Sequence, residues 1–273
     1  MIPAAPDARL PDGFAVRLSP TVRRRPDGAL LGGAPLRLMR LSRRAQELLA
    51  AGRVVVRDAT TAELAARLLD AGLAVPELSP HPADDVTVVI PVRDRPAALA
   101  RLLGALRADP GTARLPVVVV DDGSTRPVEL VGVDVVRHPV ARGPAAARNA
   151  GLRAVRTPFV AFLDSDCVPS PGWLGRLRSQ FDDPRLAVAA PRIVALAATG
   201  HGWVSVYEAA ASALDMGSEP APVRPLSAVP YVPSAALVAR RAALGDGFDE
   251  TMQVAEDVDL VWRLAAAGWR VRY

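Results

Sequence analysis

Short apolar runs alternate with amphipathic stretches over residues 85–273, and this rhythm predicts strands alternating with helices in a mainly parallel sheet. The runs are rich in Val and nearly continuous, which is typical of strands covered on both faces. The predicted strands are residues 86–92, 117–120, 133–136 and 159–163. The helices predicted between them are residues 96–107 and 143–155. The fold class that follows is α/β.

The pattern is weaker in the last third of the chain. It predicts a helix over residues 203–214, a strand over 231–240 and a helix over 257–267. The sequence stops at residues 268–273, in or just after one more predicted strand. We therefore expect the α/β domain to be incomplete at its C-terminus.

The beginning of the chain carries a different pattern. Residues 14–18 alternate like a half-buried strand and residues 29–31 form a second strand after a Pro-Asp-Gly turn, so we predict a β-ribbon there. Residues 76–84 hold three prolines and no periodicity, which indicates a linker. The predicted organisation is a small α+β domain over 1–75, this Pro-rich linker, and the α/β domain over 85–273.

Two helices are predicted inside the first domain. Ser42 is the expected N-cap of the first, while Thr60 and Glu63 form a possible capping box for the second. Both helices are expected to stop at a glycine, the residue type that most often follows a helix. Residues 73–75 are predicted to close a small sheet.

The composition is that of a folded chain, with 50% hydrophobic residues, which is ample for a core. No apolar run approaches the ~18 residues that a membrane-spanning helix needs. The N-terminus lacks a basic region followed by an apolar stretch, so no signal peptide is indicated. Cys167 is the only cysteine, which excludes an internal disulfide and fits a reducing compartment. We expect a cytoplasmic protein without a transmembrane segment, for which peripheral contact with a membrane stays open.

The charge says little about partners. The formal net charge is +4 and the pI about 10.1, because all basic residues are Arg. These arginines are scattered or form short clusters without interleaved aromatic residues, so the sequence does not indicate a nucleic-acid groove.

Two carboxylates follow the predicted strand 159–163. Asp164 and Asp166 are two residues apart, so both side chains lie on one side of an extended chain. At the carboxyl end of a parallel strand, where open α/β sheets bind their ligands, they could hold Mg²⁺ or Mn²⁺, and the cation could hold a diphosphate. A second Asp-x-Asp triplet at residues 257–259 shows that the spacing alone is weak evidence, and a solvated acidic turn is the alternative.

Four further polar stretches fall at predicted strand or helix ends, and each could simply turn the chain or cap a helix. Their order and spacing, together with the acidic pair, resemble the family 2 glycosyltransferases with the GT-A fold, over roughly residues 85–273. The matching stretches are Val-Ile-Pro-Val-Arg-Asp-Arg (89–95), Val-Asp-Asp-Gly-Ser-Thr (120–125), Ala-Ala-Arg-Asn-Ala-Gly (146–151), Phe-Leu-Asp-Ser-Asp (162–166), Gly-Phe-Asp-Glu (247–250) and Glu-Asp-Val-Asp-Leu (256–260).

The resemblance implies a role for each of these sites. The residues that it places at a nucleotide-sugar donor are Pro91, Arg93, Asp122, Arg148 and Asp164. It places Asp164 and Asp166 at the ribose and the metal-bridged diphosphate and makes Asp257 the candidate general base. Displacement of a diphosphate needs its developing charge stabilised, and an acceptor hydroxyl needs a carboxylate to take its proton. With one base and no evident second nucleophile, the simplest outcome is direct displacement with inversion.

The first domain resembles the small winged-helix domains that bind precursor peptides in the pathways of ribosomally made, modified peptides. Such a domain fused to a family 2 enzyme resembles the glycosyltransferases of mycofactocin systems. That resemblance implies a peptide-derived redox cofactor as acceptor and UDP-glucose as donor. We expect a peptide to add as a strand to the ribbon formed by residues 14–18 and 29–31. A purely structural extension is the alternative.

Three other functions stay open. A cell-envelope glycosyltransferase acting on a lipid or polysaccharide would share the same catalytic residues. A sugar nucleotidyltransferase normally needs a Gly-rich phosphate loop after the first strand, which residues 91–95 lack. A non-catalytic peptide-binding protein with a degenerate transferase domain is disfavoured by the intact acidic set.

Overall fold

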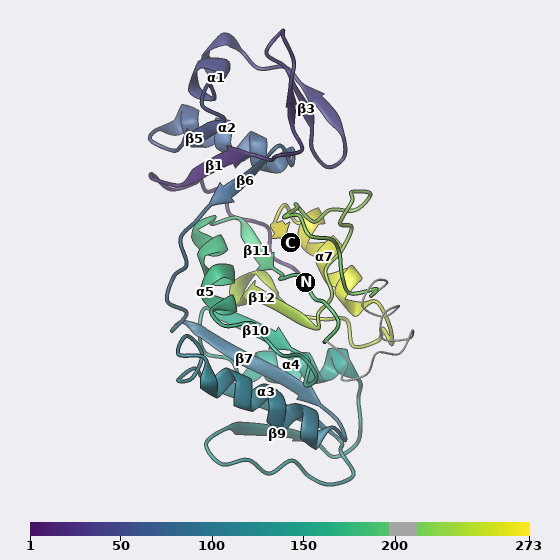
Figure 1. Ribbon diagram of the computed structural model, residues 1–273. Helices are drawn as coiled ribbons and strands as arrows, with labels where there is room; N and C mark the ends of the chain where they lie inside the picture. Colours follow the sequence, from purple (N-terminus) through teal and green to yellow (C-terminus); the bar gives the residue numbers. More distant parts are fainter. Residues whose placement is uncertain (197–211) are drawn as a thin grey trace, which may run out of the picture.

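The computed structural model describes residues 1–196 and 212–273 and shows a small N-terminal module above a larger α/β domain (Figure 1). The N-terminal module, residues 10–78, encloses a hydrophobic cluster of its own. The helix predicted over residues 203–214 lies mostly outside the described residues, and residues 212–214 are not helical.

A seven-stranded sheet forms the centre of the α/β domain. Its strands are β7 (Val86–Val92), β8 (Val117–Asp122), β9 (Asp134–His138), β10 (Phe159–Leu163), β11 (Leu186–Ala189), β12 (Ala236–Arg240) and β13 (Arg270–Arg272). The strand order is β13-β11-β12-β10-β7-β8-β9. Strands β10, β7, β8 and β9 pair in parallel, whereas β12 is antiparallel to both of its neighbours. The sheet is therefore mainly parallel, as predicted.

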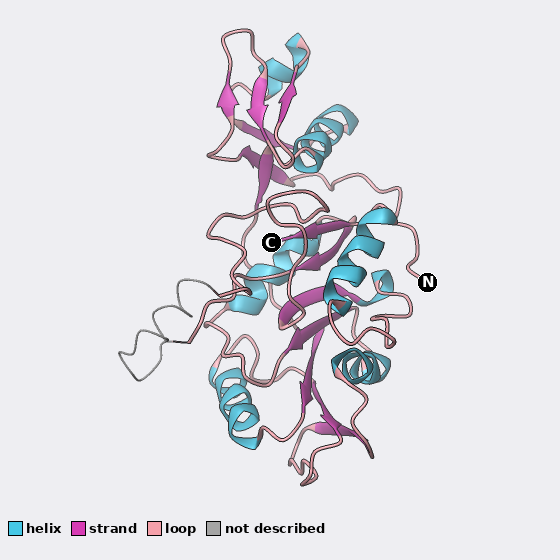
Figure 2. Cartoon of the chain, turned by 90° about the vertical axis from the view of Figure 1, so that its right-hand side faces the viewer, coloured by secondary structure: helices cyan, strands magenta, loops and turns pink. Residues whose placement is uncertain are grey.

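Helices cover both faces of this sheet (Figure 2). They are α3 (Pro96–Ala108), α4 (Pro144–Ala154), α5 (Trp173–Arg178) and α7 (Glu256–Ala266). Apolar residues of α4 and α7 pack into one core cluster, and those of α3 and α5 pack into a second cluster on the opposite face. Burial on both faces explains the continuous apolar strands of the sequence.

Most predicted elements of the α/β domain are confirmed. The strands over 86–92 and 159–163 have the predicted bounds, and the helix over 257–267 is found one residue earlier as α7. The strand predicted over 231–240 is wrong in its first half, because β12 begins only at Ala236. Neither α5 nor β11 was predicted, because they are only six and four residues long and therefore show no full period.

The N-terminal module contains two three-stranded sheets and two helices. Its elements are β1 (Ala15–Leu18), β2 (Arg23–Arg24), β3 (Leu30–Gly32), β4 (Arg37–Met39), α1 (Arg43–Leu48), β5 (Arg53–Val55), α2 (Ala59–Asp70) and β6 (Ala74–Glu77). The sheets have the orders β5-β1-β6 and β2-β3-β4. Their resemblance to a winged-helix domain stays a prediction.

Two details of this module differ from the expectations. The predicted ribbon of residues 14–18 and 29–31 is wrong, because β1 and β3 are the central strands of separate sheets and neither has a free edge. The N-cap of α2 is Asp58, whose side chain accepts a hydrogen bond from the Thr61 backbone N–H, and not Thr60. The side chain of Ser42 caps α1 as predicted.

The first residues of the chain do not lie on the N-terminal module. Ala5 N–H donates to the Ala267 carbonyl at 2.9 Å, and the Trp269 indole donates to the Pro3 carbonyl at 2.8 Å. This segment therefore packs on the α/β domain before the chain crosses to β1. Among the described residues, no helix has the length and apolar character to span a bilayer.

Candidate active site

A cavity of about 430 Å³ opens at the carboxyl ends of β7, β8 and β10. These strands are parallel neighbours in the order β10-β7-β8, so the residues that follow them meet at one edge of the sheet. The lining residues include Pro91, Arg93, Arg95, Asp122, Arg148, Asp164 and Asp166. All six residues that we predicted at the donor and the metal therefore line one cavity, and Asp257 does not.

The acidic pair lies in the turn that follows β10. Asp164 N–H donates to the Ala235 carbonyl at 2.8 Å, and its own carbonyl accepts from Cys167 N–H at 3.0 Å, which closes the turn. The carboxylate of Asp164 pairs with Arg148 at 2.7 Å, and that of Asp166 pairs with Arg95. Asp166 is half exposed, so an additional ligand can reach it.

Arg148 is the buried cation of the site. It lies on α4 with 3% of its surface exposed, and its guanidinium donates to Asp164 at 2.7 Å and to Glu256 at 2.9 Å. Its Cζ lies 5.6 Å from the centre of the Phe248 ring, within cation–π range. Its Nε has no partner among the described residues. A buried guanidinium is stable only when it is paired, so the two carboxylates hold it in place.

Asp122 binds the backbone at the start of α4. Its carboxylate accepts hydrogen bonds from His138 Nδ1 at 2.7 Å and from the Arg142 and Gly143 backbone N–H groups at 2.9 Å. Gly143 is the N-cap residue of α4, so the positive end of this helix dipole is fixed at the cavity. The N-terminus of a helix attracts anions. Arg93, Arg95 and Arg148, which line the same cavity, attract them as well.

The ends of β7 and β8 are tied to one another. Asp94, which follows β7 with φ of 52°, accepts from Thr125 N–H at 2.8 Å, and its own N–H donates to the Ser124 hydroxyl at 3.0 Å. Asp121 is fully buried. Burial raises the pKa of its carboxyl, but the hydrogen bonds from Ser124, Val128 and Arg137 lower this pKa by a larger amount, so it lies below the ordinary value. Asp121 is therefore a structural anion beneath the site.

Asp257 lies at the start of α7, beside the cavity rather than on its wall. Its Oδ2 accepts from Ser234 N–H at 3.1 Å, and Ser234 precedes Ala235, the residue bonded to Asp164 N–H. Its neighbour Glu256 reaches the same corner through Arg148. The start of α7 is thus connected to the end of β10 by two separate routes.

The acidic pair fits a hard divalent cation. Asp164 and Asp166 supply carboxylate oxygens next to open space, and among residues 1–196 and 212–273 no cluster of three or more His, Cys, Asp or Glu residues competes with them. Mg²⁺ is commonly bound by one or two carboxylates together with substrate phosphates. Two carboxylates are therefore enough for a cation that shares its ligands with a diphosphate.

Cys167 does not have the character of a nucleophile. Burial, followed by the charges of Asp164 and Asp166, raises the pKa of its thiol to about 12. The thiol lies 3.3 Å from the Ala235 carbonyl, to which it donates. A neutral thiol in this position is a packing residue.

Three side chains at the site had no predicted role. They are Arg95, His138 and Glu256, the partners of Asp166, Asp122 and Arg148. Arg95 and Glu256 belong to the stretches that carry the family resemblance, which gave no function to either of them. His138 could have been found by extending the strand predicted over 133–136 by two residues, which sets it opposite Asp122.

A sequence model of the family described as "Glycosyl transferase family 2" matches residues 87–244. Two curated relatives from Mycobacterium tuberculosis, strains CDC 1551 / Oshkosh and ATCC 25618 / H37Rv, are both named "Pre-mycofactocin glycosyltransferase". Each is 54% identical over 276 residues, which cover 97% of this chain and 57% of the relative. The "Succinoglycan biosynthesis protein ExoU" of Rhizobium meliloti (strain 1021) is 32% identical over 215 residues, 69% of this chain and 59% of that protein. The chain thus spans less than two thirds of these relatives.

Solved structures agree with the architecture. Staphylococcus aureus TarS 1-349, in complex with UDP, superposes with a TM-score of 0.53 at 23% identity and covers 68% of this chain and 57% of that chain. At this identity the likeness concerns the fold alone. It confirms the predicted GT-A fold for the α/β domain.

Proposed function

The chain belongs to glycosyltransferase family 2, and from this premise we propose that it transfers glucose from UDP-glucose to a peptide-derived redox cofactor in mycofactocin biosynthesis. The pathway is supported by the relatives named "Pre-mycofactocin glycosyltransferase", which are 54% identical over 97% of the chain. The choice of UDP-glucose rests on the resemblance to the mycofactocin-system enzymes.

The observation that carries the catalytic part of this proposal is the convergence of Asp122, Arg148, Asp164 and Asp166 on one cavity of about 430 Å³. The family resemblance places Pro91 and Asp122 at the base of the nucleotide. Arg93 and Arg148, with the N-terminus of α4, provide positive potential for the diphosphate. The parallel pairing of β10, β7 and β8 brings the residues that follow these strands to one edge of the sheet.

Asp164 and Asp166 are the groups that would hold Mg²⁺ or Mn²⁺. Such a cation, when bound, stabilises the negative charge that develops on the departing diphosphate. The role of Arg148 is to keep the carboxylate of Asp164 oriented, at 2.7 Å, and to add a second positive charge behind it. Arg95 lies against Asp166 and would have to turn away when a cation binds.

Asp257 is the proposed general base. A carboxylate at the acceptor hydroxyl takes its proton as the oxygen attacks the anomeric carbon, and the bond to the diphosphate breaks on the opposite side. One base and one displacement give inversion of configuration. The backbone N–H groups of Ser234 and Val258, which donate to Asp257, hold the carboxylate in a single orientation.

We place peptide recognition in the N-terminal module. Because β1 and β3 are central strands, a peptide that adds as a strand has to use an outer strand such as β4. Leu36 and Leu38 at this edge are 75% and 50% exposed, so apolar side chains of a peptide would find partners there.

Equilibrium binding of UDP-glucose, UDP-GlcNAc and GDP-mannose, each with Mn²⁺ and with EDTA, tests the donor assignment. We expect UDP-glucose to bind most tightly and only with the cation. Equal binding of all three donors, or binding that does not depend on Mn²⁺, would contradict it. Transfer of glucose to the peptide-derived cofactor, followed by mass spectrometry, tests the acceptor.

The relative with 32% identity favours a second candidate, because its name assigns it to succinoglycan biosynthesis. Under this alternative the acceptor is a polysaccharide precursor and the donor site is unchanged. Glucose transfer to a saccharide acceptor, with none to the peptide-derived cofactor, would favour this second function.

A further inference from the structure

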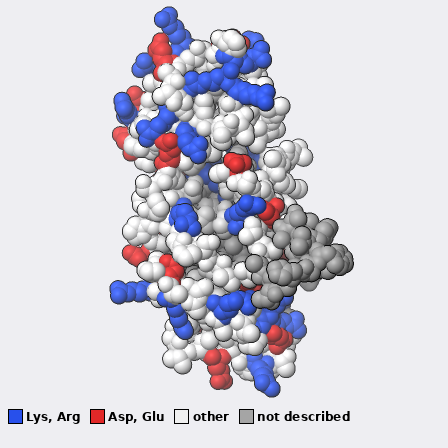
Figure 3. Space-filling model, in the orientation of Figure 1, with Lys and Arg blue, Asp and Glu red and all other residues white. Residues whose placement is uncertain are grey.

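Charged side chains meet where the N-terminal module touches the α/β domain. Helix α2 ends there at Asp70, and β13 begins there at Arg270. The cluster, which we call the boundary cluster, consists of Asp70, Asp183, Arg185, Arg224, Arg270 and Arg272. Figure 3 shows basic side chains over the upper module and at the recess between the two parts.

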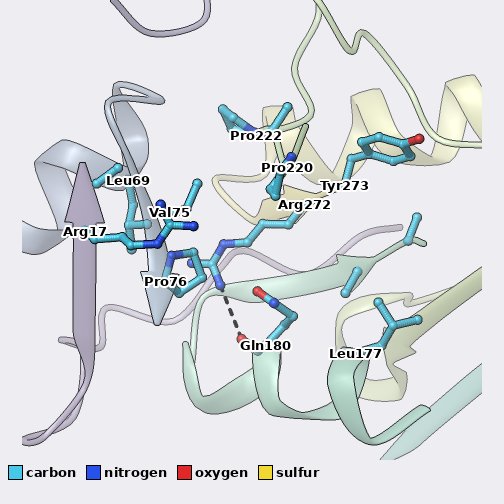
Figure 4. Close-up of a pocket in the computed structure, with 14 residues that line it drawn as sticks. Arg17, Leu69, Val75, Pro76, Leu177, Gln180, Pro220, Pro222, Arg272 and Tyr273 are labelled. Atoms are coloured by element: carbon cyan, nitrogen blue, oxygen red, sulfur yellow. Dashed lines mark hydrogen bonds between the residues drawn. The ribbon is translucent and has the colours of Figure 1, made fainter. Parts of the chain in front are cut away.

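Two of these arginines are fully paired. Arg270 is 7% exposed and donates to both oxygens of Asp70, at 2.8 and 3.0 Å, and to both oxygens of Asp183, at 3.1 and 3.0 Å. Arg272 is 8% exposed and pairs with Asp183, which is completely buried. Arg272 also donates to the Gln180 carbonyl at 3.3 Å, at the wall of a small neighbouring cavity (Figure 4).

Arg185 and Arg224 are only loosely paired. Arg224 donates one hydrogen bond to Asp70 at 3.3 Å, and Arg185 approaches Asp70 at 3.9 Å while donating to the Gly268 carbonyl at 3.1 Å. A guanidinium has five N–H donors, so both side chains keep donors that the contacts among the described residues leave unused. Both are about one third exposed.

The boundary cluster has more positive than negative charge. It contains four guanidinium groups and two carboxylates, so two positive charges are in excess. Burial lowers the pKa of Arg224, and the charges of Arg37, Arg270 and Arg185 lower it further, against the opposing effect of Asp70. The local potential therefore stays positive after all ion pairs have formed.

Open space lies beside the unused donors. A cavity of about 500 Å³ is lined by Arg185, Arg224 and their shared partner Asp70, by the paired Arg270 and Arg272, and by apolar residues that include Leu69, Pro222 and Val271. This volume is larger than an inorganic anion requires. Its lining suits a ligand with one anionic end and an apolar body.

We propose that this cavity is a second ligand site, at which Arg185 and Arg224 bind the carboxylate or phosphate of a small molecule with an apolar body. The site is separate from the donor cavity and shares no lining residue with it. Because Leu69 comes from α2 and both arginines come from the α/β domain, a ligand whose anionic end pairs with the arginines and whose apolar body packs on Leu69 contacts both parts of the chain and stabilises their contact.

Calorimetric titration of the whole chain with N-acetylleucine, with its neutral methyl ester and with inorganic phosphate tests the site. Saturating UDP and Mn²⁺ are included in a parallel series, so that anion binding in the donor cavity is recognised. We expect saturable binding of N-acetylleucine and none of the ester, because only the acid carries the charge. Tighter binding of N-acetylleucine than of phosphate identifies a carboxylate site, and the reverse order identifies a phosphate site. Equal binding of acid and ester, or no saturable binding of either anion, overturns the proposal.

Variants locate the site and separate it from a simple contact between the two parts. Arg185→Gln and Arg224→Gln each remove one charge-assisted contact and should weaken binding about tenfold. Asp70→Asn should tighten binding, because it removes the carboxylate that competes for the same arginines. The control is Arg67→Gln, which lies on the same helix but pairs with Glu63 on the surface. If Arg224→Gln binds like the parent chain, or if Asp70→Asn weakens binding, the arginines serve only to hold the two parts together.

Discussion

At the scale of single residues, the site depends on a buried cation held between two carboxylates. Arg148 is 3% exposed and joins Glu256, at the start of α7, to Asp164, at the end of β10. A charge buried to this degree is tolerated only with its partners, so both carboxylates have a structural role. Asp166 and Asp257 lack this link and are cleaner targets for mutation.

We predict that Asp166→Asn abolishes Mn²⁺-dependent binding of UDP and leaves the fold intact. The side chain is half exposed, and the loss of an anionic oxygen weakens a hard-cation site strongly. Asp164→Asn should have the same effect on binding but should also lower stability, because Arg148 loses a partner. The control is Asp259→Asn, from the second Asp-x-Asp triplet, which pairs with Arg263 on α7. If Asp166→Asn bound UDP with unchanged Mn²⁺-dependent affinity, the assignment of Asp166 as a metal ligand would be wrong.

We predict that Asp257→Asn lowers the transfer rate by about 100-fold or more with little change in donor affinity. A general base acts on the proton of the acceptor and not on the nucleotide. Single-turnover transfer and UDP titration are measured on the same preparation. A collapse of donor affinity in this variant would instead make Asp257 a donor ligand or a structural cap of α7.

We predict that Glu256→Gln costs about 1–3 kcal/mol of the free energy of unfolding, because the Arg148 guanidinium loses a charged partner in a buried position. Urea unfolding measures this loss. Glu63→Gln, which removes a surface pair with Arg67, should change stability by no more than about 0.5 kcal/mol. If both variants lost the same small amount, Glu256 would not hold Arg148.

At the scale of elements, the cavity at the ends of β7, β8 and β10 depends on the close packing of α4 on β7 and β8. Gly151 permits this approach: a Cβ built there would lie 2.3 Å from Val89 Cγ1 and 3.2 Å from Val120 Cγ2. The valines belong to β7 and β8, the strands whose ends carry Pro91 and Asp122. The position of α4, and with it that of Arg148, therefore depends on one small residue.

We predict that Gly151→Ala lowers the free energy of unfolding by about 1–3 kcal/mol, through overpacking, and weakens UDP binding. The matched control is Gly104→Ala in α3, where a Cβ would contact nothing within 4 Å. That variant should gain about 0.5–1 kcal/mol, because alanine is the better helix former. A neutral Gly151→Ala would show that α4 can move outward at no cost.

At the scale of the whole molecule, the N-terminal module and the α/β domain are joined by more than a linker. The first residues lie on the α/β domain through Pro3 and Ala5, and the boundary cluster ties Asp70 to Arg270. In the linker, His81 Nε2 lies 2.8 Å from Asp182 Oδ2. Asp70 belongs to the module itself, and the other contacts fix the segments before and after the module to the α/β domain.

We predict that Asp70 makes the stability of the chain depend on acid. Burial raises the pKa of its carboxyl. The hydrogen bond from Arg270 and the charges of Arg270, Arg185 and Arg224 together lower this pKa by a larger amount, so it lies below the ordinary value of 3.8. Because the pKa of Asp70 is lower in the folded chain than in the unfolded chain, its ionised carboxylate stabilises the fold at pH values above the unfolded-state pKa. This stabilisation is lost as the pH falls through the folded-state pKa. Urea unfolding from about pH 6 to about pH 3 should therefore show that the free energy of unfolding falls less for Asp70→Asn than for the parent chain. Parallel curves would exclude this role.

The sequence by itself determined the elements and the strand-end residues. Strand and helix periods are local properties, and burial on both faces leaves a continuous apolar run, so β7 and β10 were found with their bounds. The family resemblance grouped Asp122 with Asp164 and Asp166, and the structure brings them to one cavity because the ends of parallel strands meet at one edge of a sheet.

Only the tertiary structure decided which distant residues meet. Glu256 and Arg148 are 108 positions apart, and Asp70 and Arg270 are 200 apart, and no periodicity links them. The place of β12 between β10 and β11, and the central positions of β1 and β3, follow from strand pairing across long loops. Such pairing is set by the packing of whole layers, because a strand's own pattern shows which of its faces is buried and not which strand lies beside it.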